Sequence, residues 1–178
     1  MYNNLQIVTG APGVGKTTVL EQLDGGLHIF EEPARPIIYE HRALNGSTAS
    51  DLPVDDFVAR LLERSIGDWE HASASGTSAI FDRGVPDCIA YALHSGADPK
   101  PSIEASRQYR YHADVLLLEP WEDIYTNDDL RNMTFAQVLA FHERVLEAYE
   151  IAGYGIVKVP QDSVAERAAF IEAFVLDS

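Results

Sequence analysis

Short apolar segments alternate with longer amphipathic segments along most of the chain. Five of the short segments have the length and character of buried β-strands. They cover residues 5–9, 27–30, 78–84, 114–118 and 156–159. Such alternation predicts an α/β fold, in which helices cover both faces of an open parallel sheet.

Helical spacing predicts helices between the strands. It is clearest after Pro53, where apolar residues recur three and four positions apart as far as Trp69. The patterns T-x-x-Q from Thr134 and S-x-x-E from Ser163 predict the starts of two later helices. Further helices are expected at residues 17–23, 36–42, 86–94 and 103–111, and a mobile polar loop at 44–50. Without an internal repeat or a linker, residues 1–178 are expected to form one domain.

A phosphate-binding motif follows the first strand. Residues 10–17, GAPGVGKT, match G-x-x-x-x-G-K-[ST] and stand between a strand and a helix, as this P-loop motif requires. Backbone N–H groups of such a loop cradle a phosphate, and the helix N-terminus adds positive charge. Lys16 can reach the β- and γ-phosphates, and the Thr17 hydroxyl can bind Mg²⁺. The residues expected to bind the nucleotide are Gly10, Ala11, Pro12, Gly13, Val14, Gly15, Lys16, Thr17 and Thr18.

Ligands of open α/β sheets bind outside the carboxyl ends of the strands, which sorts the remaining candidates. Asp82 ends an apolar strand, as a Walker B aspartate does, and is expected to hold Mg²⁺ through water. The alternative is an aspartate that caps the helix near Pro86. Arg83 is fixed beside it and could bind the transferred phosphate or the substrate.

Two acidic residues follow the second strand. Glu31 and Glu32 point to opposite sides of an extended chain, so one of them can face the cleft and take a proton from an attacking hydroxyl. The alternative is a pair of solvated loop residues.

The segment after the fourth strand contains Tyr125, Asp128, Asp129 and Arg131. Small phosphoryl-transfer enzymes carry a lid here, and Arg131 is the one arginine available to reach the phosphates from it. The alternative is an ordinary exposed loop.

Several reactive residue types are expected to be structural. Arg107 and Arg110 precede the fourth strand, which puts them at the opposite edge of the sheet. Cys88, the single cysteine, excludes an internal disulfide and is expected in the core. The histidines show no metal-ligand spacing; they are His28, His41, His71, His94, His112 and His142.

Charge and composition limit the classes of binding partner that the protein can have. A formal net charge of −15 disfavours nucleic acid and anionic membranes, so the nucleotide site has to provide its own positive field. The chain has no N-terminal signal pattern and no apolar run long enough to span a membrane, which favours a cytoplasmic location. The oligomeric state stays open.

The motifs resemble those of the NadR-like AAA-domain ATPases and kinases, a family in which NadR carries a nicotinamide riboside kinase domain. The resemblance runs from residue 5 to about residue 171. Its segments are GAPGVGKTT, EEPAR, FDRGVPDCIAY, LLLEPWEDIYTNDDLR and VKVPQDSVAERAAFI.

A second resemblance is to deoxyribonucleoside kinases, whose second strand ends in Glu-Pro with the glutamate as general base. Glu32-Pro33 and Asp82-Arg83 stand in the corresponding places, so this resemblance favours Glu32 over Glu31. It also implies a P-loop fold with strand order 2-3-1-4-5.

These patterns predict an ATP- and Mg²⁺-dependent phosphotransferase that moves the γ-phosphate to a hydroxyl of a small molecule, with a nucleoside as one candidate. Lys16, Arg83 and Arg131 would stabilise the transferring phosphoryl group, and Asp87, Tyr91 and Trp121 would influence acceptor specificity. The alternative is an ATP- or GTP-binding switch, or slow NTPase, that acts through a protein partner. No N-K-x-D motif is present, which disfavours a Ras-type GTPase.

Overall fold

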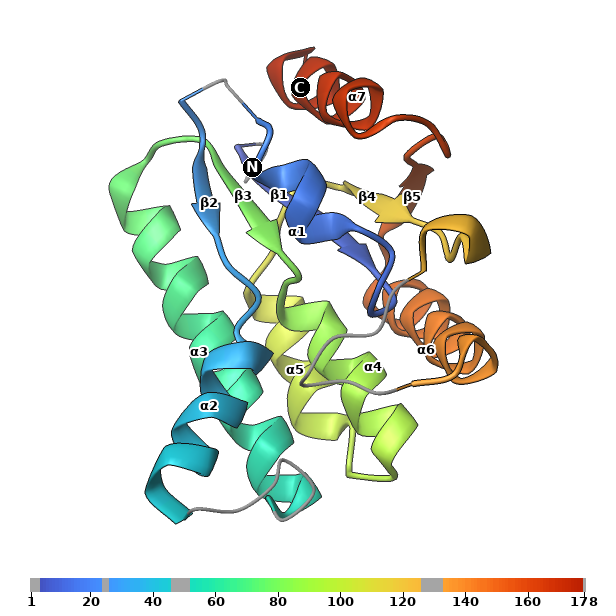
Figure 1. Cartoon of the computed structure of the whole chain (residues 1–178). Coiled ribbons are helices and arrows are strands. Elements are labelled where there is room, and N and C mark those ends of the chain that lie inside the picture. Colours follow the sequence, from blue (N-terminus) through green and yellow to red (C-terminus); the bar gives the residue numbers. More distant parts are fainter. Residues whose placement is uncertain (1–3, 24–25, 46–51, 126–132, 178) are drawn as a thin grey trace.

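The computed structural model describes residues 4–23, 26–45, 52–125 and 133–177. Five parallel strands form one sheet in the order β2-β3-β1-β4-β5, which is the predicted order (Figure 1). The strands are β1 (Leu5–Gly10), β2 (His28–Phe30), β3 (Ala79–Asp82), β4 (Asp114–Leu118) and β5 (Gly155–Lys158).

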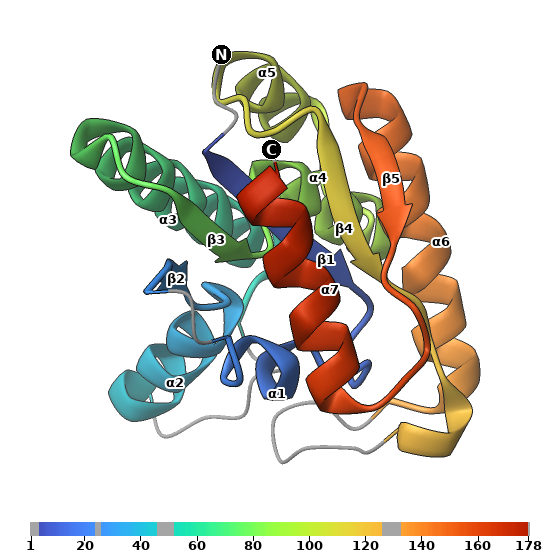
Figure 2. The ribbon, with the colours of Figure 1, turned by 90° about the horizontal axis from the view of Figure 1, so that it is seen from above.

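Helices cover both faces of the sheet. Helices α1 and α7 lie over one face and α3, α4, α5 and α6 over the other, while α2 lies beside α3 near the β2 edge (Figures 1 and 2). Their bounds are α1 (Lys16–Leu20), α2 (Ala34–Asn45), α3 (Val54–Ser75), α4 (Val85–Ser95), α5 (Lys100–Gln108), α6 (Phe135–Ala152) and α7 (Val164–Asp177). A 3₁₀ turn, η2 (Glu122–Ile124), follows β4.

The three central strands are apolar because both of their faces are covered. Every residue of β1 is buried. In the register of the sheet, Val8 lies between Asp82 of β3 and Leu116 of β4. The carboxyl ends of these strands therefore meet at one edge, where the P-loop leaves β1.

Several helices differ in extent from the sequence-based expectation. Helix α5 begins at Lys100 rather than at residue 103, because Pro101 fits the first turn, where the missing N–H is not needed. Helix α2 is longer than expected at both ends and includes two residues of the predicted 44–50 loop. Residues 46–50 of that loop lie outside the described residues.

Two structural assignments made from the sequence are confirmed. Arg110 donates from Nη1 to the Ala152 carbonyl at 2.7 Å and lies over the Tyr154 ring at 4.0 Å, far from the P-loop. The Cys88 side chain is fully buried in α4, and burial raises its pKa to about 12. The thiol is therefore a small apolar core group. None of the helices in the described ranges is long and apolar enough to cross a membrane.

Candidate functional site

The P-loop takes the conformation that its glycines allow. Gly10, Gly13 and Gly15 have φ values of +147°, +77° and +83°, which side-chain-bearing residues rarely adopt. At Gly10 space is limiting as well, because a Cβ atom would lie 2.3 Å from the Leu118 carbonyl oxygen. Any substitution at this position would therefore push the loop away from β4.

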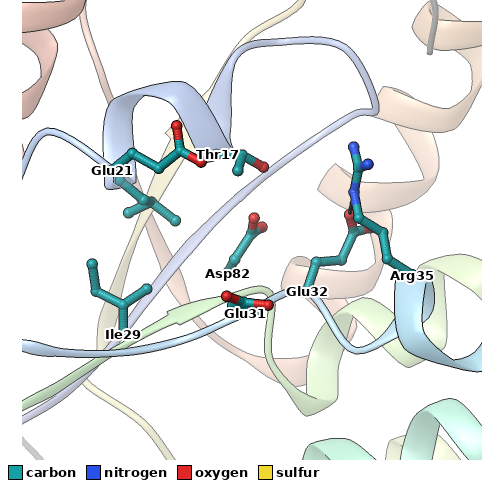
Figure 3. A pocket seen from close by; sticks show the side chains of 8 residues that line it. Thr17, Glu21, Ile29, Glu31, Glu32, Arg35 and Asp82 are labelled. Atoms are coloured by element: carbon teal, nitrogen blue, oxygen red, sulfur yellow. Dashed lines mark ion pairs between the residues drawn. The ribbon is translucent and has the colours of Figure 1, made fainter.

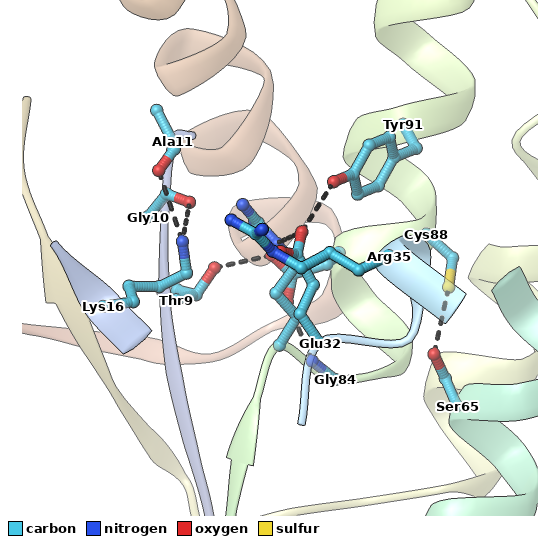
Figure 4. A network of polar contacts seen from close by, with 12 residues as sticks. Thr9, Gly10, Ala11, Lys16, Glu32, Arg35, Ser65, Gly84, Cys88 and Tyr91 are labelled. Carbon is cyan, nitrogen blue, oxygen red and sulfur yellow. Dashed lines mark hydrogen bonds and ion pairs between the residues drawn. The ribbon is translucent and has the colours of Figure 1, made fainter. Parts of the chain in front are cut away.

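The lysine of the motif folds back over its own loop. Lys16 is only 6% exposed, and its Nζ donates to the carbonyl oxygens of Gly10 and Ala11, both at 3.3 Å (Figure 4). The ammonium group is thus held against the loop, where it would face a phosphate bound by the loop.

A cavity of about 360 Å³, called the phosphate cavity here, opens beside the start of α1. Three cationic side chains and one carboxylate line it, so it provides a positive field within an acidic protein. Its lining residues are Gly13, Gly15, Lys16, Thr17, Thr18, Glu32, Arg35, Ile124, Val164 and Arg167.

The phosphate cavity contains five of the nine residues expected to bind the nucleotide. Of the other four, Gly10 and Ala11 hold Lys16 through their carbonyl groups, as described above. The Val14 carbonyl accepts a hydrogen bond from Arg167, and Pro12 lines a separate apolar cavity.

A second cavity, of about 350 Å³, adjoins the phosphate cavity and shares Thr17, Glu32 and Arg35 with it. Asp82 points into it from the end of β3, toward Thr17 (Figure 3). The carboxyl group is 4% exposed, and within the described part of the chain its Oδ1 has no hydrogen-bond partner. Burial raises the pKa of Asp82, while the nearby Lys16 charge acts in the opposite direction.

This arrangement fits Mg²⁺. The buried carboxylate oxygen without a partner and the Thr17 hydroxyl are hard oxygen ligands on one cavity wall. The described residues contain no group of three or more His, Cys, Asp or Glu side chains able to hold a metal ion. Mg²⁺ commonly takes one or two protein ligands and completes its shell with phosphates and water.

Glu32 is the buried member of the acidic pair, and Glu31 is exposed. The Glu32 Oε1 atom accepts hydrogen bonds from Arg83 Nε at 2.9 Å and from the Tyr91 hydroxyl at 3.2 Å. Its Oε2 atom lies 3.5 Å from Arg35 Nε (Figure 4). Glu32 is therefore fixed in place at the wall that the two cavities share.

Arg83 holds the Glu32 carboxylate in place. Its φ is +76°, the one positive value among the described non-glycine residues, and its side chain is 3% exposed. Besides Glu32 it contacts Asp87 at 3.1 Å and lies over the rings of Tyr91 and Phe141, at 5.6 and 5.8 Å. These contacts assign Arg83 the positioning of Glu32, while a direct contact with phosphate stays a prediction.

Asp87 is the centre of this network. Its Oδ1 accepts from Thr9 Oγ1 at 2.6 Å and from Arg83, and its Oδ2 accepts from Gly84 N–H at 2.9 Å and from the Tyr149 hydroxyl at 2.5 Å. Since it is only 1% exposed, Asp87 acts on the site through Arg83 and does not face an acceptor. Its position four residues after Arg83, at the start of a helix, is the sequence signal for this pairing.

A third cavity, of about 310 Å³, has Tyr91 in its wall and is called the aromatic cavity here. It extends from Pro12 of the P-loop to α2, α3, α4 and α6. Most of its lining is apolar or aromatic. The lining residues are Pro12, Ile38, Leu52, Val54, Phe57, Tyr91, His94, Ser95, Met133 and Phe141.

The sequence reasoning missed two arginines. Arg35 lines both polar cavities and contacts Glu32, and Arg167 of α7 reaches the P-loop. A signal existed for each, since Arg35 follows β2 by a few residues and Arg167 follows the capping box after β5. The predicted lid residues Asp128, Asp129 and Arg131 lie outside the described residues. Tyr125, just before them, donates from its hydroxyl to the Met133 carbonyl.

Comparison with known proteins agrees with the fold. The family described as AAA domain matches residues 6–167. A crystal structure of NadR protein in complex with NR has the same fold, with a TM-score of 0.65 and 19% sequence identity. That match covers 97% of this chain and 52% of the NadR chain, so this chain spans about half the length of its structural neighbour. No curated protein matches the sequence. The chain belongs to the AAA-domain family of P-loop proteins.

Proposed function

We propose that this protein transfers the γ-phosphate of ATP to a hydroxyl group of a small molecule that carries a flat ring, such as a nucleoside. The observation that carries the proposal is the position of Glu32. Its buried carboxylate lines the phosphate cavity and accepts a hydrogen bond from Tyr91, which lines the aromatic cavity. A carboxylate between a phosphate site and an apolar pocket has the position that an acceptor-activating group needs.

The aromatic cavity supports a ring-bearing acceptor. Tyr91 packs edge to face with Phe57 at 5.7 Å and with Phe141 at 5.0 Å, so the walls are aromatic and already ordered. A ring bound there would contact Pro12 of the P-loop at one end and leave its hydroxyl near Glu32. The NadR structure, which is a complex with NR, supports the same class of ligand by analogy of fold.

The transfer step follows from this placement. Glu32 orients the acceptor hydroxyl and accepts its proton, while the hydroxyl oxygen attacks the γ-phosphorus. The bond from that phosphorus to the bridging oxygen breaks, and ADP leaves with the electron pair. Lys16 and Arg35 line the same cavity and offset the charge on the phosphoryl oxygens. Mg²⁺ held by Thr17 and Asp82 would neutralise the charge of the β- and γ-phosphates.

The test is ADP release and phosphorylated product, measured with ATP, Mg²⁺ and a panel of nucleosides. Glu32→Gln should lower the acceptor-dependent turnover number by roughly 10²–10⁴-fold, because the amide cannot take the proton. ATP affinity should change little. Glu31→Gln is the comparison variant, because Glu31 is the alternative base and lines the second cavity but is exposed, and it should keep most of the turnover. Lys16→Ala should abolish turnover with every acceptor.

The opposite results are equally clear. Equal turnover with and without an acceptor, or nucleotide binding without turnover, would support a switch or slow NTPase. Unchanged turnover in Glu32→Gln would remove that residue from the reaction. Phosphorylation of an oligonucleotide end in preference to any nucleoside would contradict the small-molecule assignment, which the net charge of −15 supports.

A further inference from the structure

Arg167 occupies an unusual position for a buried arginine. It lies in the first turn of α7, is 5% exposed, and lines the phosphate cavity beside the P-loop. Its Nη1 atom lies 3.3 Å from the point where a Cβ atom of residue 15 would be, so the glycine leaves room for the guanidinium group. A cation near a helix N-terminus is unfavourable, because that end carries partial positive charge.

The charge of Arg167 is poorly compensated by the protein. Its one hydrogen bond is a long one, from Nη1 to the Val14 carbonyl at 3.4 Å, and Nε is buried with no partner within the described ranges. Arg83 provides the comparison, since it is also buried but pairs with two carboxylates. Across the residues that the structure describes, Arg167 forms no ion pair. Burial lowers its pKa, while the charge of the exposed Asp162 acts in the opposite direction.

A buried guanidinium without a counter-charge is destabilising unless a ligand supplies the anion. Among the acidic residues that the structure describes, none forms an ion pair with this arginine. We infer that Arg167 binds the phosphate chain of the nucleoside triphosphate, and that α7 thereby adds a cationic side chain to the phosphate site of the P-loop. The inference rests on the proposed nucleotide site and is independent of the transfer step.

Trp121 gives this contact a direct readout. The Arg167 guanidinium carbon lies 6.0 Å from the centre of the Trp121 ring, at the start of η2. When Arg167 turns toward a phosphate, the surroundings of this indole change. Trp69, the second tryptophan, is buried in α3 and donates from Nε1 to the Arg110 carbonyl, far from the P-loop. A Trp69→Phe background therefore isolates the fluorescence of Trp121.

The experiment measures the affinity of ATP and of inorganic tripolyphosphate, both with Mg²⁺, by calorimetry and Trp121 fluorescence. Arg167→Met keeps an unbranched stem but removes the guanidinium group and its charge, and it should weaken the binding of both ligands by about 10- to 100-fold. Arg144→Met is the matched control, because Arg144 is an exposed arginine of α6 paired with Glu147, and it should leave both affinities unchanged. Arg167→Lys keeps a point charge and should lose less affinity than Arg167→Met.

Thermal unfolding without ligand separates a binding role from a structural one. If the charge of Arg167 is compensated only by a bound anion, Arg167→Met should be at least as stable as the wild type before nucleotide is added. Arg167→Lys takes over the affinity test if Arg167→Met does not fold.

Three results would overturn the inference. The first is wild-type affinity for both ligands in Arg167→Met. The second is a loss for ATP with none for tripolyphosphate, which would assign the arginine to the base. The third is an equal loss of affinity in Arg144→Met, which would mean that only the net charge of the protein matters. A chain that binds both ligands through Arg167 but phosphorylates no acceptor would contradict the proposed transfer alone.

Discussion

At the scale of single residues, Asp82 shows how a binding site is kept ready at the expense of stability. Its carboxyl group is buried at the end of β3, and Oδ1 has no hydrogen-bond partner among the described residues. Burial places the folded-state pKa above the ordinary value of 3.8. The charged form is thus held in an environment that disfavours it until a cation binds.

This leads to a prediction for Asp82→Asn in the absence of nucleotide and Mg²⁺. The pKa of Asp82 is higher in the folded than in the unfolded state, so its negative charge lowers the free energy of unfolding. This loss is complete at pH values above the folded-state pKa. It is absent at pH values below the unfolded-state pKa near 3.8. The variant should therefore gain about 1–3 kcal/mol near neutral pH, with the gain shrinking as the pH falls toward 4. Urea unfolding at several pH values measures it. A less stable variant near pH 7 would mean that attraction to Lys16 outweighs burial.

At the scale of elements, α6 connects the fold to the site. It carries Phe141, which lines the aromatic cavity, and Tyr149, which donates to Asp87. Its start is fixed by the predicted capping box: Gln137 N–H donates to Thr134 Oγ1 at 3.3 Å, and Thr134 N–H donates to Gln137 Oε1 at 2.7 Å. Met133 separates the box from residues 126–132, which lie outside the described ranges.

Thr134→Ala should lower the free energy of unfolding by about 1 kcal/mol, because the orphan N–H groups of the first turn lose their acceptor. Because the side chains of Met133 and Phe141, which line the aromatic cavity, are both kept, the Michaelis constant for the acceptor should change little. Denaturant unfolding and steady-state kinetics together test this. Thr134→Ser, which keeps the hydroxyl, is the control and should retain most of the stability. A large rise in the Michaelis constant would show that the cap also shapes the cavity.

The elements also show what the sequence can predict. The five strands follow from apolar runs between polar turns, and the P-loop, Asp82 and Glu32 follow from their places at strand ends. Helix ends were less predictable, as the early start of α5 shows, because local turn chemistry decides them. Arg167 was missed because its approach to the P-loop depends on how α7 packs against α1. The packing of two helices that lie far apart in the sequence cannot be read from a local sequence pattern.

At the scale of the whole molecule, the dominant feature is the charge of −15. The cationic residues Lys16, Arg35 and Arg167 line one cavity, whereas Asp and Glu outnumber Lys and Arg by 28 to 13 in the chain, which leaves an excess of negative charge on its surface. Such a surface repels itself in the folded state, and dissolved salt screens the repulsion.

Raising the NaCl concentration from about 20 to about 200 mM should therefore increase the melting temperature by roughly a few degrees near pH 7.5. The increase should fade as the pH approaches the isoelectric point near 4.6, where the net charge vanishes. Calorimetry in NaCl and in KCl measures the effect and separates screening from binding of one particular cation. A melting temperature that falls with salt would indicate that attractive ion pairs dominate the surface.

The hydrogen bonds around Asp87 have a consequence for how the sequence of this protein can drift. Thr9 on β1 and Tyr149 on α6 each donate to the same carboxylate, although they stand 140 positions apart in the chain. Replacing Asp87 with an apolar residue would leave both of these buried hydroxyl groups without their acceptor. Among relatives, positions 9, 87 and 149 should thus be inherited as a set, and an apolar residue at position 87 should appear only together with apolar residues at the other two.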